Sequence, residues 1–376
     1  MTTISLQTKQ LTQKKFTNEI IFVLLMWLFS RLLIISVMCL IAPAIAPNLV
    51  NSGWESFTDW DGNWYRSIAA SGYEYADDNA QHSMAFFPLY PLITRGLMSL
   101  GISFAIAGTI VNNLAFLGAL LVLYYWVKQC QGLRAARWAT AVLAWCPFSL
   151  YGTVTYTEGS FLLFSTAALQ AFDRKKHFKA GIFGALTTAT RITGVTLIPA
   201  FMLVAWRERR SAIAYVAALA TSGGLLLFML YCAIQFKDPL AFIHAQRGWR
   251  AYNGNGWSPW LNLFTQDLML RKGLSTALIA VTKVLMFFGG GCVLWLTRSQ
   301  LPRVAFIYGL CSLALLFSSG AVVNSVNRYS YGIVSLSFAL GLLLARNPRW
   351  GYATMGLFVA IGIYFSMRFA CGLWVA

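Results

Sequence analysis

The sequence predicts an all-α polytopic membrane protein, because its composition is strongly apolar and its apolar residues come in successive long runs. Of its 376 residues, 58% are hydrophobic and only 11% are charged. A run of about 20 apolar residues spans the hydrocarbon core of a bilayer as a helix. Backbone groups in lipid must bond within their own segment, so each run is expected to be helical. Most soluble classes of protein are excluded by this composition.

A polar stretch over residues 1–18 precedes the first apolar run, which lies at about 20–40. The run is longer than a signal-peptide core, and no small-residue cleavage site follows it, so we expect it to be retained as the first span. The polar stretch carries Lys9, Lys14 and Lys15, and the positive-inside rule places such a tail in the cytoplasm. We interpret the net charge of +17 as a topology signal rather than a sign of nucleic-acid binding.

The remaining apolar runs bring the expected total to about eleven segments. They lie at about 104–128, 137–153, 159–172, 180–191, 195–206, 211–234, 273–296, 304–320, 330–345 and 351–369. This order puts the basic clusters at 134–137, 173–179, 207–210, 298–303 and 346–349 on the cytoplasmic side. The two segments that flank Arg191 are short, so we expect a broken or re-entrant hairpin there.

Residues 19–376 are therefore expected to form a single transmembrane domain with extracytoplasmic loops at about 44–103 and 235–272. Arg31 and Lys283 fall near the middles of predicted spans, where an unpaired charge is costly. We expect both side chains to face protein or a cavity.

The first outer loop contains two carboxylates, Asp59 and Asp61, separated by Trp60. Trp64 and Ile68 follow on one helical face, which predicts a short helix in the membrane interface with Asp61 at its start. One interpretation is that Asp61 only caps this helix by accepting a backbone N–H bond. The other is that the two carboxylates form a base or cation site at the depth of the lipid headgroups.

Five segments carry a family resemblance along most of the chain. They are 60–73 (WDGNWYRSIAASGY), 85–91 (AFFPLYP), 156–161 (YTEGSF), 191–194 (RITG) and 327–329 (NRY). Together they resemble the PIG-V family, the GPI mannosyltransferases that add the second mannose, and its bacterial relatives. That family belongs to the GT-C superfamily of multi-span glycosyltransferases, which take sugars from polyprenyl or dolichyl phosphate. The resemblance implies a GT-C-like helical bundle.

The activity that the resemblance implies is transfer of a hexose, with mannose as the expected sugar, from a lipid-phosphate donor to an extracytoplasmic acceptor with inversion. Inversion requires one displacement and one base. Asp61 matches the family's Trp-Asp element and is the expected base, with Asp59 assisting by orienting the acceptor. Trp60, Trp64, Glu158 and Tyr329 are expected to bind donor or acceptor.

The leaving lipid phosphate calls for arginine donors, since a guanidinium binds phosphate oxygens in a bidentate way. The candidates on the outer side are Arg191, Arg247, Arg250 and Arg328. For Arg247 and Arg250 the alternative is an interfacial anchor whose side chain snorkels to water. For Glu158 the alternative is a first-turn carboxylate that only complements the helix dipole.

No motif demands a metal or another cofactor, because the three His and seven Cys show no ligand spacing. A divalent ion at the two aspartates stays open as an alternative to arginine alone. The expected partners are a lipid-linked sugar, membrane lipids, and a glycolipid, polysaccharide or protein acceptor, and not nucleic acid. The expected location is a bacterial inner membrane, or the endoplasmic reticulum in a eukaryote. The main rival function is a polytopic lipid or glycolipid transporter or flippase, which would more often show related halves than this chain does.

Overall fold

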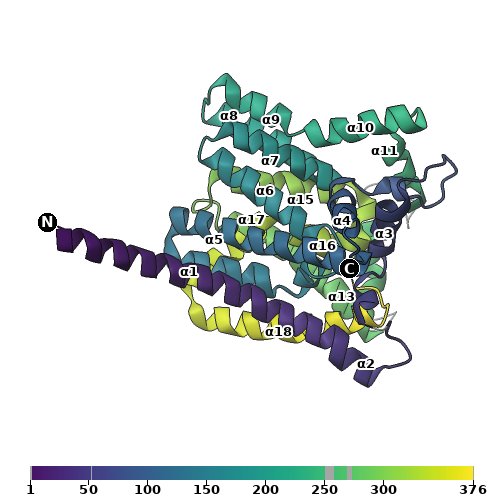
Figure 1. Ribbon diagram of the computed structural model, residues 1–376, viewed down its shortest axis with the longest axis horizontal. Helices are drawn as coiled ribbons and strands as arrows, with labels where there is room; N and C mark the ends of the chain where they lie inside the picture. Colours follow the sequence, from purple (N-terminus) through teal and green to yellow (C-terminus); the bar gives the residue numbers. More distant parts are fainter. Residues whose placement is uncertain (1, 52, 250–257, 269–272, 376) are drawn as a thin grey trace.

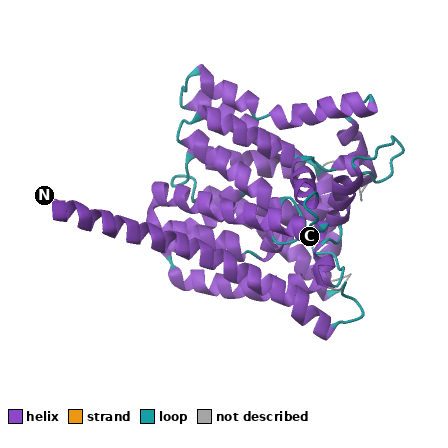
Figure 2. Cartoon of the chain, viewed as in Figure 1, coloured by secondary structure: helices purple, strands orange, loops and turns teal. Residues whose placement is uncertain are grey.

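The computed structural model describes residues 2–51, 53–249, 258–268 and 273–375, and within these ranges the regular structure is helical, without strands (Figure 2). Long helices pack beside one another into one bundle, and α1 (Thr2–Ser36) extends beyond it at the N-terminus (Figure 1). The expected polar tail is thus the first part of the same helix that forms the first apolar segment. The predicted all-helical bundle is confirmed.

The described residues contain four helices long and apolar enough to cross a membrane, or up to six if each of two bent pairs counts as one span. The four are Thr17–Ile45, Phe104–Trp145, Ser275–Leu296 and Pro348–Ala370. The bent pairs are Ala212–Ala220 with Gly223–Phe236 and Val323–Tyr331 with Val334–Arg346, and two shorter apolar helices are Ile192–Arg207 and Arg303–Ser318. A polytopic arrangement is therefore confirmed, whereas the expected total of eleven is not.

The remaining helices have the following bounds. They are α2 (Ala42–Ile45), α3 (Asp61–Ser71), α4 (Leu89–Met98), α5 (Phe104–Trp145), α6 (Glu158–Asp173), α7 (His177–Thr190), α8 (Leu197–Arg207), α9 (Ala212–Ala220), α10 (Gly223–Phe236), α11 (Ala241–Ala245), α12 (Ser258–Asn262), α13 (Leu274–Val284), α14 (Gly290–Leu296), α15 (Arg303–Ser318), α16 (Val326–Tyr331), α17 (Val334–Arg346) and α18 (Pro348–Ala370).

Two helix breaks differ in how well the sequence predicts them. The expected segment 137–153 ends early, at Trp145, and a 3₁₀ turn at Pro147–Gly152 follows. The cause is Pro147, because the residue before a proline is driven out of the helical region, and Cys146 has φ −48° and ψ 136°. The break at Arg191 is predicted correctly: α7 ends at Thr190, Arg191 is extended, and a 3₁₀ turn precedes α8.

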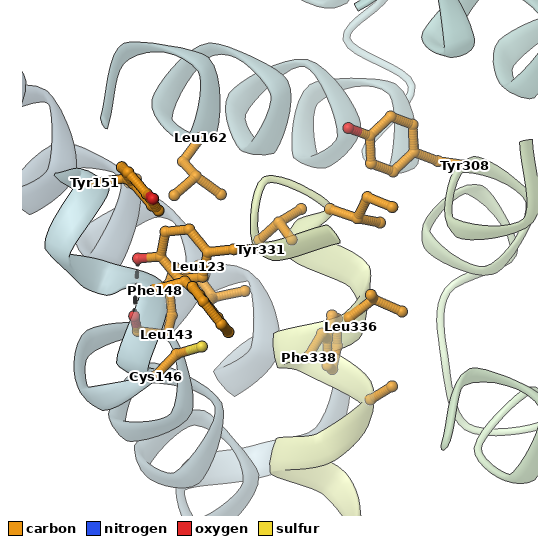
Figure 3. Packing of buried hydrophobic residues seen from close by; sticks show 14 of the residues in the cluster. Leu123, Leu143, Cys146, Phe148, Tyr151, Leu162, Tyr308, Tyr331, Leu336 and Phe338 are labelled. Carbon is orange, nitrogen blue, oxygen red and sulfur yellow. Dashed lines mark hydrogen bonds between the residues drawn. The ribbon is translucent and has the colours of Figure 1, made fainter. Parts of the chain in front are cut away.

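The core lies where the second half of α5, the turn after it, α16 and α17 meet. Figure 3 shows Tyr331 beside Leu143 and Phe148, and the Tyr331 hydroxyl donates to the Leu143 carbonyl at 3.1 Å. A Cβ placed on Gly341 would collide with the backbone of Ala139, so α17 approaches α5 closely through small residues. This packing fixes the frame from which the outer elements extend.

Charged contacts gather at the end of the bundle where α6 and α7 are joined. Lys128 of α5 lies 2.6 Å from Glu19 of α1, and the Trp126 indole donates to Asp173 of α6 at 2.9 Å. Arg303 lies 3.5 Å from Glu208, which follows α8. Helices α3, α4 and α11 lie at the opposite end (Figure 1). Lys128 and Arg303, the latter from the basic cluster at 298–303, therefore lie at one end of the bundle, away from the first outer loop.

Candidate functional site

The backbone turns sharply just before the first outer helix. Trp60 has φ 58° and ψ −120°, in the left-handed region that favours glycine, and α3 begins at the next residue, Asp61. The predicted short helix is confirmed, and its position in the membrane interface stays a prediction. The capping interpretation of Asp61 is wrong, because Trp60 occupies the capping position and makes no side-chain capping bond. The Asp61 carboxylate is free for another partner.

That partner is Arg328, in α16, as part of a chain of four charged side chains that we call the ion chain: Asp61, Arg328, Glu158 and Arg191. Asp61 Oδ2 lies 2.5 Å from Arg328 Nη1. Glu158 Oε1 lies 3.1 Å from Arg328 Nε and 2.6 Å from Arg191 Nη1. The ion chain thus joins α3, α6, the break after α7, and α16, with alternating charges that sum to zero.

Exposure falls along the ion chain from Asp61 to Glu158, and Arg191 beyond Glu158 is also buried. The side chains are 14% exposed at Asp61, 9% at Arg328, 1% at Glu158 and 7% at Arg191. Glu158 Oε2 is buried without a hydrogen-bond partner, and the nearby Arg328 Nε forms no well-directed hydrogen bond. Buried charges are tolerated when they are paired. In the ion chain one carboxylate oxygen of Glu158 and one N–H group of Arg328 remain able to accept and donate further hydrogen bonds.

Aromatic rings enclose the two guanidinium groups. Arg191 stacks 4.5 Å from the ring centre of Tyr329, and Arg328 lies 5.4 Å from the same ring and 5.1 Å from that of Tyr156. The negative face of each ring attracts the cations and excludes water from them. Tyr329 is therefore a packing partner of both arginines.

The segment 146–157, between α5 and α6, is held in place by polar side chains from the bundle. Arg31 of α1 donates to the Ser149 carbonyl at 2.7 Å and to the Thr153 hydroxyl at 2.8 Å. Asn112 of α5 donates to the Tyr151 carbonyl at 2.7 Å. Irregular backbone at membrane depth is tolerated only where protein groups satisfy it in this way. These bonds explain how Arg31 is accommodated in a predicted span.

The same segment orients the start of α3. The Thr155 amide and hydroxyl both donate to the Phe57 carbonyl at 3.0 Å. The Asp61 amide donates to the Tyr156 hydroxyl at 3.2 Å. A Cβ on Gly62 would lie 2.6 Å from Thr155 Oγ1, so the first turn of α3 packs tightly here. Asp61 is thereby aimed at the ion chain.

Asp59 is not brought into the ion chain. Its carboxylate accepts a hydrogen bond from Asn51 at 3.2 Å. Partial burial raises the pKa of Asp59 above its ordinary value, and the Asn51 bond offsets only part of this rise. The turn at Trp60 thus separates the two aspartates. Within the described ranges, no three His, Cys, Asp or Glu side chains gather closely enough to hold a metal ion.

The tryptophans predicted to bind substrate lie in two aromatic groups near α3. Trp60 meets Trp374, close to the C-terminus, edge to face at 5.0 Å. Trp64 stacks on Phe86 with ring centres 6.1 Å apart and meets Trp249 at 5.2 Å. The contact with Trp374 joins residues too distant in sequence to be anticipated.

The remaining candidates are Arg247 and Arg250, from the predicted second outer loop, and Lys283, from a predicted span. Arg247 pairs with Asp77 at 3.5 Å, and both side chains are about half exposed. This places Arg247 in a surface pair between the two outer loops rather than in the ion chain. Arg250 lies outside the described residues. Lys283 is buried, as expected of a charge in a predicted span.

Sequence reasoning missed three residues that shape the site: Tyr156, Asn112 and Trp374. Tyr156 lies within the motif at 156–161, where only Glu158 drew attention. Asn112 carries an amide inside an otherwise apolar run, and such polar residues in spans usually have a packing or functional role. The amide at position 112 is therefore a signal that the sequence itself carries.

The family model described as mannosyltransferase (PIG-V) matches residues 9–244, well over half of the chain. The matched part contains Asp61, Glu158 and Arg191. Arg328 lies outside the matched residues, but the fold brings it into an ion pair with Asp61.

Two curated relatives are GPI mannosyltransferases. GPI alpha-1,6-mannosyltransferase 2 of Cricetulus griseus is 23% identical over 240 residues, which cover 54% of this chain and 47% of that protein. GPI mannosyltransferase 2 of Cryptococcus neoformans is 28% identical over 184 residues, which cover 44% of this chain and 42% of that protein. The chain therefore spans about half or less of the length of these relatives.

Solved structures show a shared fold at low identity. ArnT from Cupriavidus metallidurans bound to undecaprenyl phosphate matches with a TM-score of 0.58 at 15% identity, covering 91% of this chain and 63% of that one. The archaeal oligosaccharyltransferase AglB from Archaeoglobus fulgidus, in complex with an inhibitory peptide and a dolichol-phosphate, matches with a TM-score of 0.50 at 13% identity, covering 93% and 55%. The GT-C-like architecture implied by the motifs is confirmed.

Proposed function

Since the chain belongs to the mannosyltransferase (PIG-V) family, we propose that it transfers a hexose, with mannose as the expected sugar, from a polyprenyl- or dolichyl-phosphate donor. The acceptor is a hydroxyl group of a glycolipid, polysaccharide or protein on the extracytoplasmic side. The observation that carries this proposal is the pairing of Asp61, at the outer end of the bundle, with Arg328 at 2.5 Å. It sets a carboxylate base beside a cation suited to phosphate.

The reaction is a single displacement at the anomeric carbon. The bond from that carbon to the phosphate oxygen breaks, and a bond to the acceptor oxygen forms on the opposite face. The acceptor proton passes to the Asp61 carboxylate, which acts as the general base. A phosphate leaving group needs no general acid, so one carboxylate base is enough for inversion, and Asp59, bonded to Asn51, is not needed as a second one.

The leaving lipid phosphate gains negative charge as the sugar departs. Arg328 is the donor we assign to it, with Arg191 behind it across Glu158. A guanidinium in a water-poor site stabilises developing phosphate charge strongly, because it needs no reorientation during the reaction. The lipid phosphates named for ArnT and AglB, which share the fold, support a donor of this class.

The end of the bundle that carries α3 is proposed to be extracytoplasmic. The support is that basic side chains gather at the other end, which the positive-inside rule assigns to the cytoplasm. The N-terminus is then cytoplasmic, in a bacterial inner membrane or the endoplasmic reticulum membrane of a eukaryote.

The test uses purified protein in nanodiscs with radiolabelled undecaprenyl-phospho-mannose and a panel of glycolipid, oligosaccharide and peptide acceptors. We expect labelled glycoside from the wild type, and at least a hundredfold less from Asp61→Asn, in line with the roughly 10²–10⁴-fold contribution of a general base. A parallel assay in sealed vesicles follows movement of the donor between leaflets. If the donor moves between leaflets and neither assay yields labelled glycoside, the protein is a flippase and not a transferase.

A further inference from the structure

We propose that the donor phosphate displaces the Asp61 carboxylate from Arg328, so that Asp61 becomes free to act as the base only when the donor is bound. This inference rests on the proposed function and concerns how donor binding is coupled to release of the base. In the structure the base is occupied by the same guanidinium that is assigned to the phosphate. One guanidinium position cannot serve a carboxylate and a phosphate oxygen equally at once.

The charge of the ion chain makes an exchange necessary. Two carboxylates and two guanidinium groups already neutralise one another. A phosphodiester donor adds one negative charge and therefore needs donors released from an existing pair. Arg191 is committed to Glu158 at 2.6 Å and covered by Tyr329. Arg328 has an Nε without a well-directed bond, so it is the cation able to turn toward phosphate in a bidentate way.

Asp61, rather than Glu158, is the carboxylate that yields. Glu158 is 1% exposed and would be left buried without a full complement of cations, which is strongly unfavourable. Asp61 is 14% exposed and begins α3, a helix of 11 residues. The dipole at that helix start continues to stabilise a carboxylate after Arg328 leaves. Glu158 is thus a positioning residue that holds both guanidinium groups.

The exchange also keeps the charge of the site constant during transfer. When the anomeric carbon–oxygen bond breaks, the phosphate goes from one negative charge to two. In the same step Asp61 takes the acceptor proton and loses its charge. The net charge of the phosphate and the ion chain together is therefore unchanged. A weakly hydrated site then does not have to stabilise any additional charge in the transition state.

The test measures binding of undecaprenyl phosphate to protein in nanodiscs, using the wild type, Asp61→Asn and Asp59→Asn. If phosphate competes with Asp61 for Arg328, Asp61→Asn binds undecaprenyl phosphate tighter, on the order of tenfold, which corresponds to about 1.4 kcal/mol. Asp59→Asn removes the same charge two residues away, from a carboxylate bonded to Asn51, and is expected to change the dissociation constant less than twofold. Undecaprenol, which lacks the phosphate, is expected to bind all three proteins alike.

If Asp61→Asn binds undecaprenyl phosphate no tighter than Asp59→Asn does, the coupling is overturned. This includes the case in which both variants bind equally tighter than the wild type, because that is a general charge effect. If Asp61→Asn is not recovered folded, Asp61→Ser removes the same carboxylate and takes its place. The outcomes separate from those of the proposed function. A wild type that transfers mannose while Asp61→Asn binds no tighter refutes only the coupling. Tighter binding by Asp61→Asn without any transfer by the wild type supports only the displacement of Asp61 by phosphate and refutes the enzyme, and with it the release of a base.

Discussion

Arg31, in the apolar part of α1, donates two hydrogen bonds to Ser149, one to its carbonyl at 2.7 Å and one to its hydroxyl at 2.9 Å. It also donates to the Ala144 carbonyl at 3.2 Å, at the end of α5. The acceptors named here are neutral oxygens, and they lie where the dipole of α5 presents its negative end. Arg31 therefore stabilises irregular backbone through hydrogen bonds, and the acceptors named here include no carboxylate.

Arg31→Met is predicted to lower kcat more than it changes KM, because the segment that Arg31 fastens aims Asp61 through Tyr156. Leaving buried carbonyls unbonded costs about 1–3 kcal/mol each, so the unfolding temperature should also fall. The matched control is Arg298→Met, since Arg298 is exposed at the other end and stacks on Trp295. Transfer kinetics that match the wild type in Arg31→Met would refute the positioning role.

Glu158→Gln is predicted to destabilise the protein more than Asp61→Asn does. Glu158 is the shared partner of Arg191 and Arg328, and removing one partner of a buried pair costs roughly 3–5 kcal/mol. Asp61 lies closer to water, so its loss should cost less. Thermal unfolding in one detergent measures the order. As a control, Glu55→Gln breaks an exposed pair with Arg66 and should cost about 1 kcal/mol or less. The reverse order of Glu158 and Asp61 would contradict the burial gradient.

The sequence predicts the helices well, because apolar runs report directly on spans. It predicts their ends less well: the segment expected to reach residue 153 stops at Trp145, although Pro147 was a readable signal. The individual charges of the site were all identifiable beforehand. Their pairing was not, because Asp61 and Arg328 are 267 residues apart in the chain and meet only through packing.

The roles of Asp59 and Asp61 show the same limit at short range. Two residues apart, they look equivalent in the sequence. They diverge because Trp60 adopts φ 58°, which directs one carboxylate to Asn51 and the other to Arg328. A backbone conformation of this kind in a non-glycine residue is set by the surrounding fold and leaves no mark in composition or periodicity.

The junction of the two outer loops is predicted to loosen in acid. Asp238 accepts hydrogen bonds from His244 at 2.7 Å and from the Tyr75 hydroxyl at 2.9 Å. Burial raises the pKa of Asp238, but the bonds from His244, the Leu240 amide and Tyr75 lower this pKa more, so the net pKa lies below its ordinary value. A carboxyl with a lowered folded pKa stabilises the fold above the unfolded pKa of about 3.9, and this contribution is lost as pH falls through the folded pKa.

Hydrogen exchange of residues 73–87 and 238–249, followed from pH 7 downward, measures that loss with allowance for the intrinsic pH dependence of exchange. Tyr75→Phe removes one hydrogen bond to the carboxylate. The pKa of Asp238 should then rise toward its ordinary value, and protection should be lost at a higher pH than in the wild type. Tyr352→Phe, at an exposed position on α18, is the control. Identical protection profiles for Tyr75→Phe and wild type would show that the Tyr75–Asp238 bond does not hold the loops together.

Trp60 offers a test of whether strain is stored beside the candidate base. At φ 58° and ψ −120° a residue with a Cβ is strained by about 1–3 kcal/mol, whereas glycine is not. Trp60→Gly should therefore be more stable than Trp60→Ala by roughly that amount, although both lose the contact with Trp374. Ala is normally the more stabilising of the two, because it restricts the unfolded chain. The measurement is the difference in unfolding temperature between the two variants. Alanine at or above glycine would mean that Trp60 relaxes without cost and that the turn which separates Asp59 from Asp61 is not strained.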